Sequence, residues 1–223
     1  MAIDDNAASR EAVLARVRTA LGRSGGADAA RATALAYIAG RRQGPRPSMA
    51  ADLVTRFLAR ATDMASTVER VATLDVVPPA VASYLAALGP AGEAARCGVC
   101  WPQFATLGWA QAGLTVESRP TVGHDALGIT GCFCAIAETG TLVMASGTQT
   151  PSATFLLPDT HVAIVLADQV VPGMEEAFAR VREQGALPRA VNLVSGPSRT
   201  GDIEQTIVLG AHGPRRMHVV LVG

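Results

Sequence analysis

The sequence contains no lysine, since all 19 of its basic residues are arginine. This absence excludes a Schiff-base enzyme, a nucleotide-binding P-loop with its lysine, and an enzyme with a lysine general base. The formal net charge is zero. Nucleic acid and anionic membrane surfaces both require a basic patch, so we expect neither as a partner.

Aromatic residues make up only 4% of the 223 residues, whereas hydrophobic residues make up 49%. The core must therefore consist mainly of Ala, Val, Leu and Ile. No apolar run approaches the ~18 residues that a membrane-spanning helix needs. The acidic start, MAIDDNAAS, lacks the basic-then-apolar pattern of a secretory signal. We expect a soluble, cytoplasmic protein.

The four cysteines occur as two pairs, Cys97 with Cys100 and Cys132 with Cys134. Thiolates at short spacing are common ligands of zinc and iron–sulfur clusters. Both pairs lie in apolar stretches that predict strands, and alternation puts Cys97 and Cys100 on opposite faces. Buried free cysteine behaves as a small hydrophobic residue. We therefore predict no metal site and no cofactor bound by this chain.

The first 64 residues have the spacing of helices. Apolar residues predict three of them, over residues 8–21, 31–39 and 48–64. Ser48 is the expected N-cap of the third helix, and the segment GRRQGPRP before it predicts a solvated linker. We assign residues 1–64 to a helical N-terminal extension.

From residue 65 the pattern changes to strands that alternate with helices. The predicted strands cover residues 67–73, 95–101, 114–118, 131–137, 141–145, 161–166, 191–195 and 217–222. The predicted helices cover residues 78–88, 107–112, 174–184 and 200–205. Such alternation implies a mostly parallel sheet with helices on both faces. We assign residues 65–223 to one α/β domain.

The run GITGCFCAIAETGTLVMAS places a single acid, Glu138, within nearly continuous apolar sequence. Glu138 lies between two predicted strands, so its carboxylate is at a strand end. A carboxylate there must face a cleft, a hydrogen-bond donor or a ligand, because burial without a partner is costly. Glu138 is therefore a candidate catalytic residue, and Thr139, Gly140 and Thr141 are candidate ligand-binding residues.

A second polar segment, SGPSRTGDIE, follows a predicted strand. Gly196 predicts a tight turn, and the N-terminus of the predicted helix after it offers free amides to an anion. The candidate ligand-binding residues of this segment are Ser195, Gly196, Ser198, Arg199 and Thr200. The guanidinium of Arg199 suits a carboxylate or a phosphate. Alternatively, Arg199 pairs with Asp202 or Glu204, and the turn is only structural.

Among the four histidines, His212 is the strongest candidate for a catalytic role. Gly210 and Gly213 flank it and allow the backbone to approach a ligand closely. The alternative is a turn histidine without a partner. His161 opens a predicted strand and is a weaker candidate, and His218 is expected within a strand.

The segments AIAETGTLV, LLPDTHVAIV, NLVSGPSRTGDIEQTIVLGAHGP and HVVLV together resemble the lactate utilisation protein C family, whose members contain a LUD domain. The resemblance is specific in the second half of the chain and weak before Val99. It departs from the family pattern at Phe133, where many members have an acidic residue. It implies a three-layer α/β/α sandwich similar to the NagB/RpiA/CoA transferase superfamily.

The resemblance also implies a role in oxidising lactate to pyruvate, together with partner proteins that carry iron–sulfur clusters. Glu138, Arg199 and His212 would then line a cleft that binds a small carboxylate or docks a partner. Two alternatives remain open. One is a stand-alone acyl or CoA transferase with Glu138 as its nucleophile, and the other is a non-catalytic scaffold or regulatory protein.

Overall fold

The computed structural model describes residues 4–22, 27–48, 52–201 and 207–223, and it comprises two compact units, Met1–Pro47 and Ser48–Gly223. The first unit contains α1 (Asp4–Ala20) and α2 (Ala27–Gly40), which confirms the two predicted helices. Within the described residues, no helix combines the length and apolarity needed to cross a membrane.

The second unit begins with α3 (Leu53–Asp63). Its N-cap is Asp52, whose carboxylate accepts hydrogen bonds from the backbone N–H groups of Val54 and Thr55, both at 3.1 Å. The Thr55 hydroxyl also donates to this carboxylate and lowers the pKa of Asp52. The predicted cap, Ser48, is wrong, because the helix begins at Leu53 and the side chain of Asp52 caps it.

Helix α3 belongs to the core of the second unit, where Phe57 and Ala61 are buried in the same cluster as the central strands. The two compact units therefore divide between Pro47 and Ser48, whereas the sequence pattern placed this helix with the extension. An amphipathic spacing shows that one face of a helix is buried, but not which element buries it.

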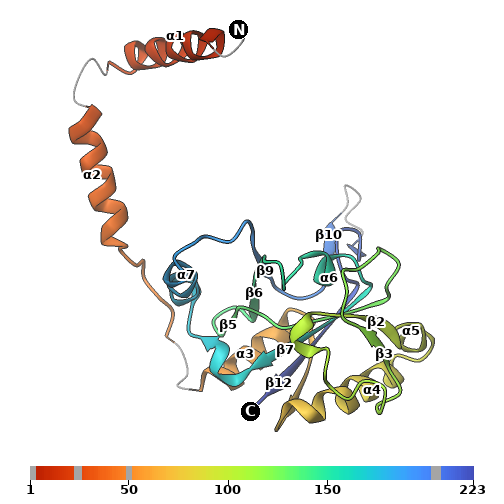
Figure 1. The fold of residues 1–223 in the computed structure, drawn as a ribbon. Coiled ribbons are helices and arrows are strands. Elements are labelled where there is room, and N and C mark those ends of the chain that lie inside the picture. Colours follow the sequence, from red (N-terminus) through yellow and green to blue (C-terminus); the bar gives the residue numbers. More distant parts are fainter. Residues whose placement is uncertain (1–3, 23–26, 49–51, 202–206) are drawn as a thin grey trace. The chain divides into compact units, whose positions relative to one another are not determined.

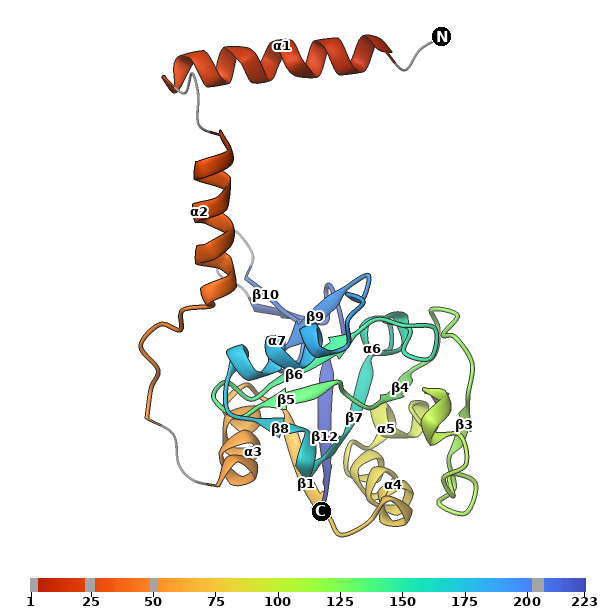
Figure 2. The same ribbon diagram turned by 60° about the vertical axis from the view of Figure 1, so that its left-hand side comes forward.

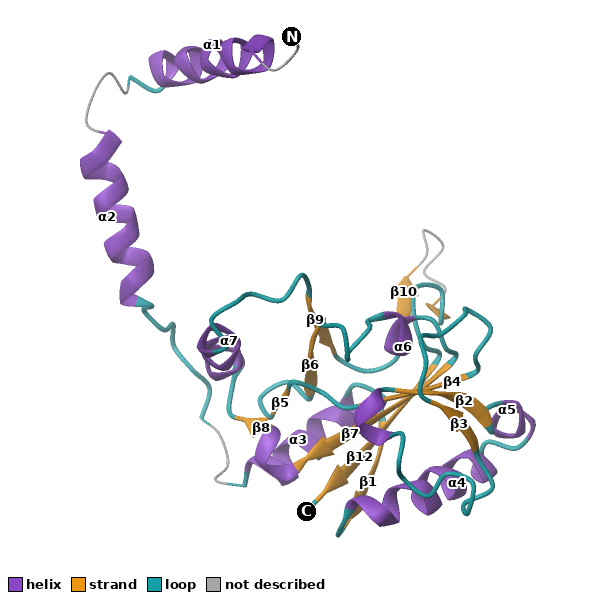
Figure 3. Ribbon diagram, in the orientation of Figure 1, coloured by secondary structure: helices purple, strands orange, loops and turns teal. Residues whose placement is uncertain are grey.

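The central sheet has six parallel strands in the order β1-β12-β7-β4-β2-β3 (Figure 3). The strands are β1 (Thr67–Val71), β2 (Cys97–Cys100), β3 (Thr115–Glu117), β4 (Leu127–Thr130), β7 (Thr160–Leu166) and β12 (Arg216–Val222). The three middle strands β12, β7 and β4 are almost wholly buried. Their continuous apolar sequences are typical of parallel strands that are covered on both faces.

Helices cover both faces of this sheet (Figures 1 and 2). On one face, Tyr84 of α4 (Val77–Ala87) stacks on His218 with ring centroids 4.0 Å apart. On the other, Phe155 of α6 (Ala153–Leu156) lies 6.0 Å from His161, ring to ring. His218 is paired with Val162, the neighbour of His161, so the two histidines point to opposite faces.

Helix α5 (Pro90–Ala94) contacts α4, and α3 contacts β1 (Figure 3). Together these elements form the three layers of an α/β/α fold, which confirms the expected fold class. Short 3-10 helices, η1 (Leu74–Val76), η2 (Pro102–Phe104) and η3 (Ala167–Gln169), follow β1, β2 and β7.

A second sheet of four strands has the order β8-β5-β6-β9. Its strands are β8 (Val170–Val171), β5 (Cys134–Ile136), β6 (Thr141–Ala145) and β9 (Val191–Val194), and α7 (Met174–Glu183) packs on β5. The pairs β5/β6 and β6/β9 are antiparallel, while β5/β8 is parallel. The strands predicted on either side of Glu138 therefore lie in this second sheet and not in the central sheet. A turn as short as the one between them can join only antiparallel strands, whereas the strands of the central sheet are parallel.

Two predicted helices are wrong. Residues 107–112 form turns, which direct the buried Trp109 inward so that its indole Nε1 donates to the Phe104 carbonyl at 2.8 Å. Thr200 belongs to β10 (Arg199–Gly201), which pairs with β11 (Ile207–Leu209) in an antiparallel ladder. Residues 202–206 of that prediction lie outside the described residues. The sequence pattern did not predict strand β4, because the apolar residues continue beyond Thr130, where this strand ends.

Candidate functional site

Glu138 lies in the tight turn between β5 and β6. The Gly140 N–H donates to the Ile136 carbonyl at 2.9 Å, and the Glu138 N–H donates to the Pro172 carbonyl at 3.1 Å. The Glu138 side chain is half-buried, and its carboxylate has no hydrogen bond or ion pair with the described residues. The turn therefore holds a carboxylate whose oxygen atoms are not used by the fold.

The turn is held against the end of α3. Gly140 has a φ of +67°, and a Cβ at this position would overlap the backbone of Arg60 and Ala61. Gly196 has a φ of +79°, and a Cβ there would overlap the Met64 carbonyl. Both turns thus require glycine for its conformation and for its lack of a side chain. The last turn of α3 supports the two predicted segments from the same side.

A chain of hydroxyl groups joins those two segments. The Thr139 and Thr141 Oγ1 atoms are 2.7 Å apart, and the Thr141 Oγ1 atom is 2.6 Å from the Ser195 Oγ atom. Pairing of Leu142 with Val194 brings β6 and β9 together at this point. Each hydroxyl can donate one hydrogen bond and accept others, so the chain can be polarised in either direction.

Ser198 organises the loop that precedes β12. Its backbone N–H donates to the Pro214 carbonyl at 2.8 Å, and its carbonyl accepts from the Gly210 N–H at 3.0 Å. Its Oγ atom accepts from the backbone N–H of His212 at 3.3 Å. Ser198 therefore stabilises this loop, and the residues after it form strand β10 instead of the predicted helix. The exposed His212 imidazole makes no polar contact with the described part of the chain.

Arg199 is exposed on β10, and its guanidinium has no hydrogen bond or ion pair among the residues that the structure describes. Asp202 and Glu204, the alternative partners, lie outside the described residues. Thr200 is paired with Val208 in the hairpin. The hydrogen bonds of the predicted site segments thus form two groups, one around Thr141 and one around Ser198. The cleft of Glu138, Arg199 and His212 stays a prediction.

A pocket of about 300 Å³ lies beyond the carboxyl ends of three central strands. Its lining includes Trp101 and Gln103 after β2, Cys132 and Phe133 after β4, Gln169 at the end of η3, and Ser146 after β6. None of the site residues predicted from the sequence lines it. No pattern in the sequence marked the glutamines of this pocket as site residues. The position of the pocket is nevertheless a usual one, because ligands of open parallel sheets bind beyond the carboxyl ends of the strands.

Gln169 fixes the position of the pocket's wall. Its Oε1 atom accepts from the Leu166 N–H at 2.9 Å, and its Nε2 atom donates to the Cys132 carbonyl at 3.0 Å. The carboxamide thus ties the end of β7 to the segment between β4 and β5. The Gln169 side chain therefore links the central sheet to the segment that leads into the second sheet, beside the pocket.

Three of the four cysteines are buried, namely Cys100, Cys132 and Cys134, as the sequence predicted, whereas Cys97 is exposed. Burial raises the pKa of Cys100 and of Cys134 to about 11, and it raises the pKa of Cys132 further. Metals bind the thiolate form, which burial disfavours at these three positions. The described residues contain no cluster of three His, Cys, Asp or Glu side chains suited to a metal ion.

The two buried histidines have structural positions. His161 Nε2 lies 2.8 Å from the Thr130 hydroxyl, and burial lowers the pKa of His161 to about 3. His218 Nδ1 lies 2.9 Å from the Thr67 hydroxyl, and burial lowers its pKa to about 4. Both rings are therefore neutral at physiological pH, and each one packs between the sheet and a covering helix.

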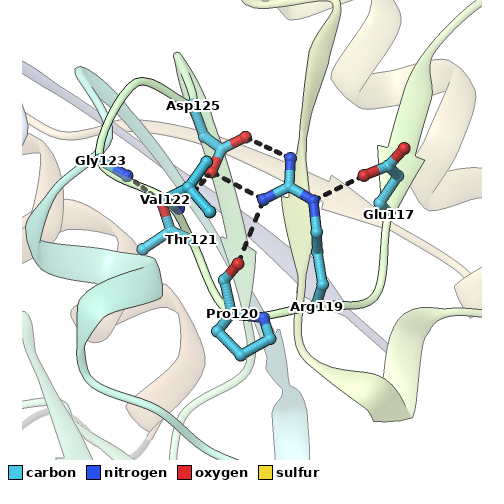
Figure 4. Close-up of polar contacts among 7 residues, drawn as sticks. All are labelled: Glu117, Arg119, Pro120, Thr121, Val122, Gly123 and Asp125. Carbon is cyan, nitrogen blue, oxygen red and sulfur yellow. Dashed lines mark hydrogen bonds and ion pairs between the residues drawn. The ribbon is translucent and has the colours of Figure 1, made fainter.

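An ionic cluster that the sequence did not reveal closes the loop between β3 and β4 (Figure 4). Arg119 donates to both carboxylate oxygens of Asp125, at 2.7 and 3.0 Å, and to Glu117 at 2.6 Å. The Thr121 hydroxyl also donates to Asp125 at 2.8 Å. The Arg119 guanidinium holds the pKa of Asp125 well below its usual range. These charged side chains pair with one another within the loop, so we interpret the cluster as a structural feature that stabilises the loop.

Comparison with protein families gives a match to the LUD domain over residues 106–222. Lactate utilization protein C of Deinococcus radiodurans is 34% identical over 190 residues, which cover 80% of this chain and 84% of that protein. Proteins of the same name are similar over shorter stretches. That of Geobacillus kaustophilus is 38% identical over 43% of this chain and 42% of its own, and that of Bacillus subtilis is 34% identical over 55% and 53%.

The fold is similar to the crystal structure, at 1.70 Å resolution, of a DUF162 family protein from Deinococcus radiodurans. The TM-score is 0.55, and the sequence identity is 28%. The match covers 79% of this chain and all of that one. The similarity therefore extends beyond the second half of the chain, where the sequence motifs are concentrated.

Proposed function

The chain belongs to the LUD domain family, and from this premise we propose that it functions in lactate utilization. The observation that carries the proposal is its 34% identity, over 80% of its length, to the Lactate utilization protein C of Deinococcus radiodurans. In this proposal the chain is a cytoplasmic subunit of an assembly that oxidises L-lactate to pyruvate. Partner proteins with iron–sulfur clusters carry the electrons.

The donor atoms of this chain support the assignment of the redox groups to partners. Its buried thiols have raised pKa values and are protonated at neutral pH. They are also embedded in the cores of the two sheets. The contribution of this chain is then to bind a carboxylate or to dock a partner.

Arg199 and the Glu138 turn are the groups available for that contribution. The Arg199 guanidinium is exposed and unpaired within the described chain, so it can form a bidentate pair with a carboxylate of lactate or of a partner. The hydroxyl chain from Thr139 to Ser195 offers neutral donors and acceptors beside Glu138. In this proposal His212 completes the site.

The first test is growth of the native host on lactate after deletion of the gene, together with purification of the tagged protein from lactate-grown cells. We expect the deletion to abolish growth on lactate and the purified assembly to be brown and to oxidise lactate with an artificial acceptor. Normal growth of the deletion strain on lactate would exclude the proposed role. A colourless, solitary protein would exclude the iron–sulfur partners.

The second test concerns Arg199 and uses Arg189, another exposed arginine with no partner in the described chain, as its control. We expect Arg199→Ala to lower lactate oxidation by the purified assembly roughly tenfold, as for loss of one charged hydrogen bond. Arg189→Ala should have no effect. Equal rates for the two variants would remove Arg199 from the site.

A transferase is the alternative function, and the unpaired carboxylate of Glu138 is the observation that favours it. In such an enzyme the Glu138 carboxylate attacks the carbonyl carbon of an acyl-CoA and displaces the CoA thiolate, which gives a mixed anhydride. The thiolate then attacks the glutamyl carbonyl carbon of this anhydride, which gives a glutamyl thioester and releases the acyl group as a free carboxylate. Mass spectrometry after incubation with acyl-CoA would detect this thioester at Glu138. Its absence, with full lactate oxidation by Glu138→Gln, would exclude Glu138 as a catalytic residue in either function.

A further inference from the structure

The pocket beside Gln169 has the position of a ligand site in an open parallel sheet. Strand β2 has β3 on one side and β4 on the other, so the chain reverses its direction of progress across the sheet at this point. Ligands of such sheets bind beyond the carboxyl ends of the strands at this reversal. Trp101 and Gln103 follow β2 directly, and Cys132 and Phe133 follow β4, so both flanking strands contribute to the pocket.

Among the residues that the structure describes, none of those that line this pocket has a charged side chain. Its polar groups are carboxamides, hydroxyls and a thiol that burial keeps protonated. A free carboxylate or phosphate would leave water without gaining a cationic partner, which is unfavourable. The lining therefore selects an uncharged ligand and disfavours lactate itself.

Two carboxamides in the lining are free to bind a ligand. Gln169 is fully engaged with the Leu166 N–H and the Cys132 carbonyl. Gln103 and Gln184, in contrast, are exposed and have no hydrogen bond in the part of the chain that the structure describes. Each carboxamide offers a donor and an acceptor in one plane, which is the pattern that pairs with the edge of a nucleobase.

The lining and the volume of the pocket suit a flat ring. The half-buried Phe133 presents an aromatic surface on which a flat heterocycle can stack. The lack of a side chain at Gly131 leaves room for the Gln103 carboxamide, because a Cβ at residue 131 would lie 2.5 Å from the Gln103 Nε2 atom. The volume, about 300 Å³, is at the lower end of the range for small-molecule sites.

We propose that this pocket binds an uncharged nucleobase-like heterocycle, with its face on Phe133 and its edge on Gln103 and Gln184. The ligand is distinct from lactate. This inference rests on the lining and the sheet topology alone, so it is independent of the role in lactate utilization.

The test is calorimetric titration of the purified full chain with adenosine and with nicotinamide, two uncharged probes that carry the required ring and edge. We expect at least one of them to bind with a stoichiometry of one. Gln103→Ala and Gln184→Ala should each weaken that binding roughly threefold to tenfold, as for loss of one hydrogen bond. Phe133→Ala should weaken it by a similar factor because it removes the stacking surface.

Gln111→Ala is the matched control, since Gln111 is exposed and does not line the pocket. It should bind the probe as the unmodified chain does. Failure of both probes to bind at millimolar concentrations would overturn the proposal, as would unchanged binding by the Gln103→Ala and Gln184→Ala double variant. Displacement of the probe by lactate would also contradict it. Growth on lactate does not enter this measurement, so a negative result leaves the proposed function intact.

Discussion

The two sheets of the second unit differ in how they bury their strands and in where they leave polar groups. The central strands are parallel and are connected by crossovers, and β7 and β12 are paired over their whole length within the large core. The second sheet has a small core of its own around Cys134, Ile136 and Val143. Its antiparallel strands are joined by the turn that contains the unpaired Glu138. The large core thus supports the fold, whereas the turns of the second sheet carry the polar groups that are available for binding or catalysis.

The largest effect is expected in the large core. Ile164 of β7 and Ile136 of β5 are both buried, at 1% and 0% exposure, so the same substitution can be compared in the two sheets. Ile164→Ala should lower the free energy of unfolding by about 4 kcal/mol, and Ile136→Ala by about 2 kcal/mol, because a small cluster can collapse more easily around the cavity. Chemical denaturation of both variants measures the difference. A larger loss for Ile136→Ala would reverse the ranking of the two cores.

The sequence predicted strands β7 and β12 closely, and it predicted the strands beside Glu138 but not the separate sheet that they form, for a physical reason. Strands β7 and β12 are continuous runs of Val, Ile and Leu bounded by polar residues, and such runs have few alternatives to a buried parallel strand. The strands beside Glu138 have the same composition, and composition does not specify a partner strand. Their sheet is decided by the shortness of the turn between them, which permits only an antiparallel pair.

The candidate site shows the same division. The turns at Gly140 and Gly196 could be predicted, because glycine beside polar residues between apolar runs signals a turn. The contact between Thr141 and Ser195 required the pairing of β6 with β9, which no local pattern encodes. The pocket at Gln169 could not be predicted either, since its lining comes from the ends of distant strands.

The second prediction tests whether the Glu138 turn depends on its support by α3. Gly140 and Gly185 both have positive φ angles, of +67° and +77°, but only Gly140 is close to another backbone segment. Gly140→Ala should lower the free energy of unfolding by about 3 kcal/mol, from backbone strain and steric overlap together. Gly185→Ala should cost about 1 kcal/mol from strain alone. Thermal and chemical unfolding compare the two, and equal losses would show that contact with α3 contributes nothing.

The smallest effect distinguishes a paired carboxylate from an unpaired one. Asp125 is bound by Arg119 and the Thr121 hydroxyl, whereas the Glu138 carboxylate has no partner in the described chain. Asp125→Asn should lower the free energy of unfolding at neutral pH by about 2 kcal/mol, because the charged hydrogen bonds to Arg119 are lost. Glu138→Gln should change it by less than about 0.5 kcal/mol.

The dependence of stability on pH provides the control for this pair. The pKa of Asp125 is lower in the folded chain than its value of about 3.9 in the unfolded chain. Its contribution is therefore fully present above pH 4 or so and is lost as the pH falls through the folded pKa. Denaturation at neutral and acid pH should show a smaller difference between Asp125→Asn and the unmodified chain in acid. A difference that stays constant down to the folded pKa would mean that Asp125 stabilises the loop by its shape rather than by its charge, and the contrast with Glu138 would lose its electrostatic basis.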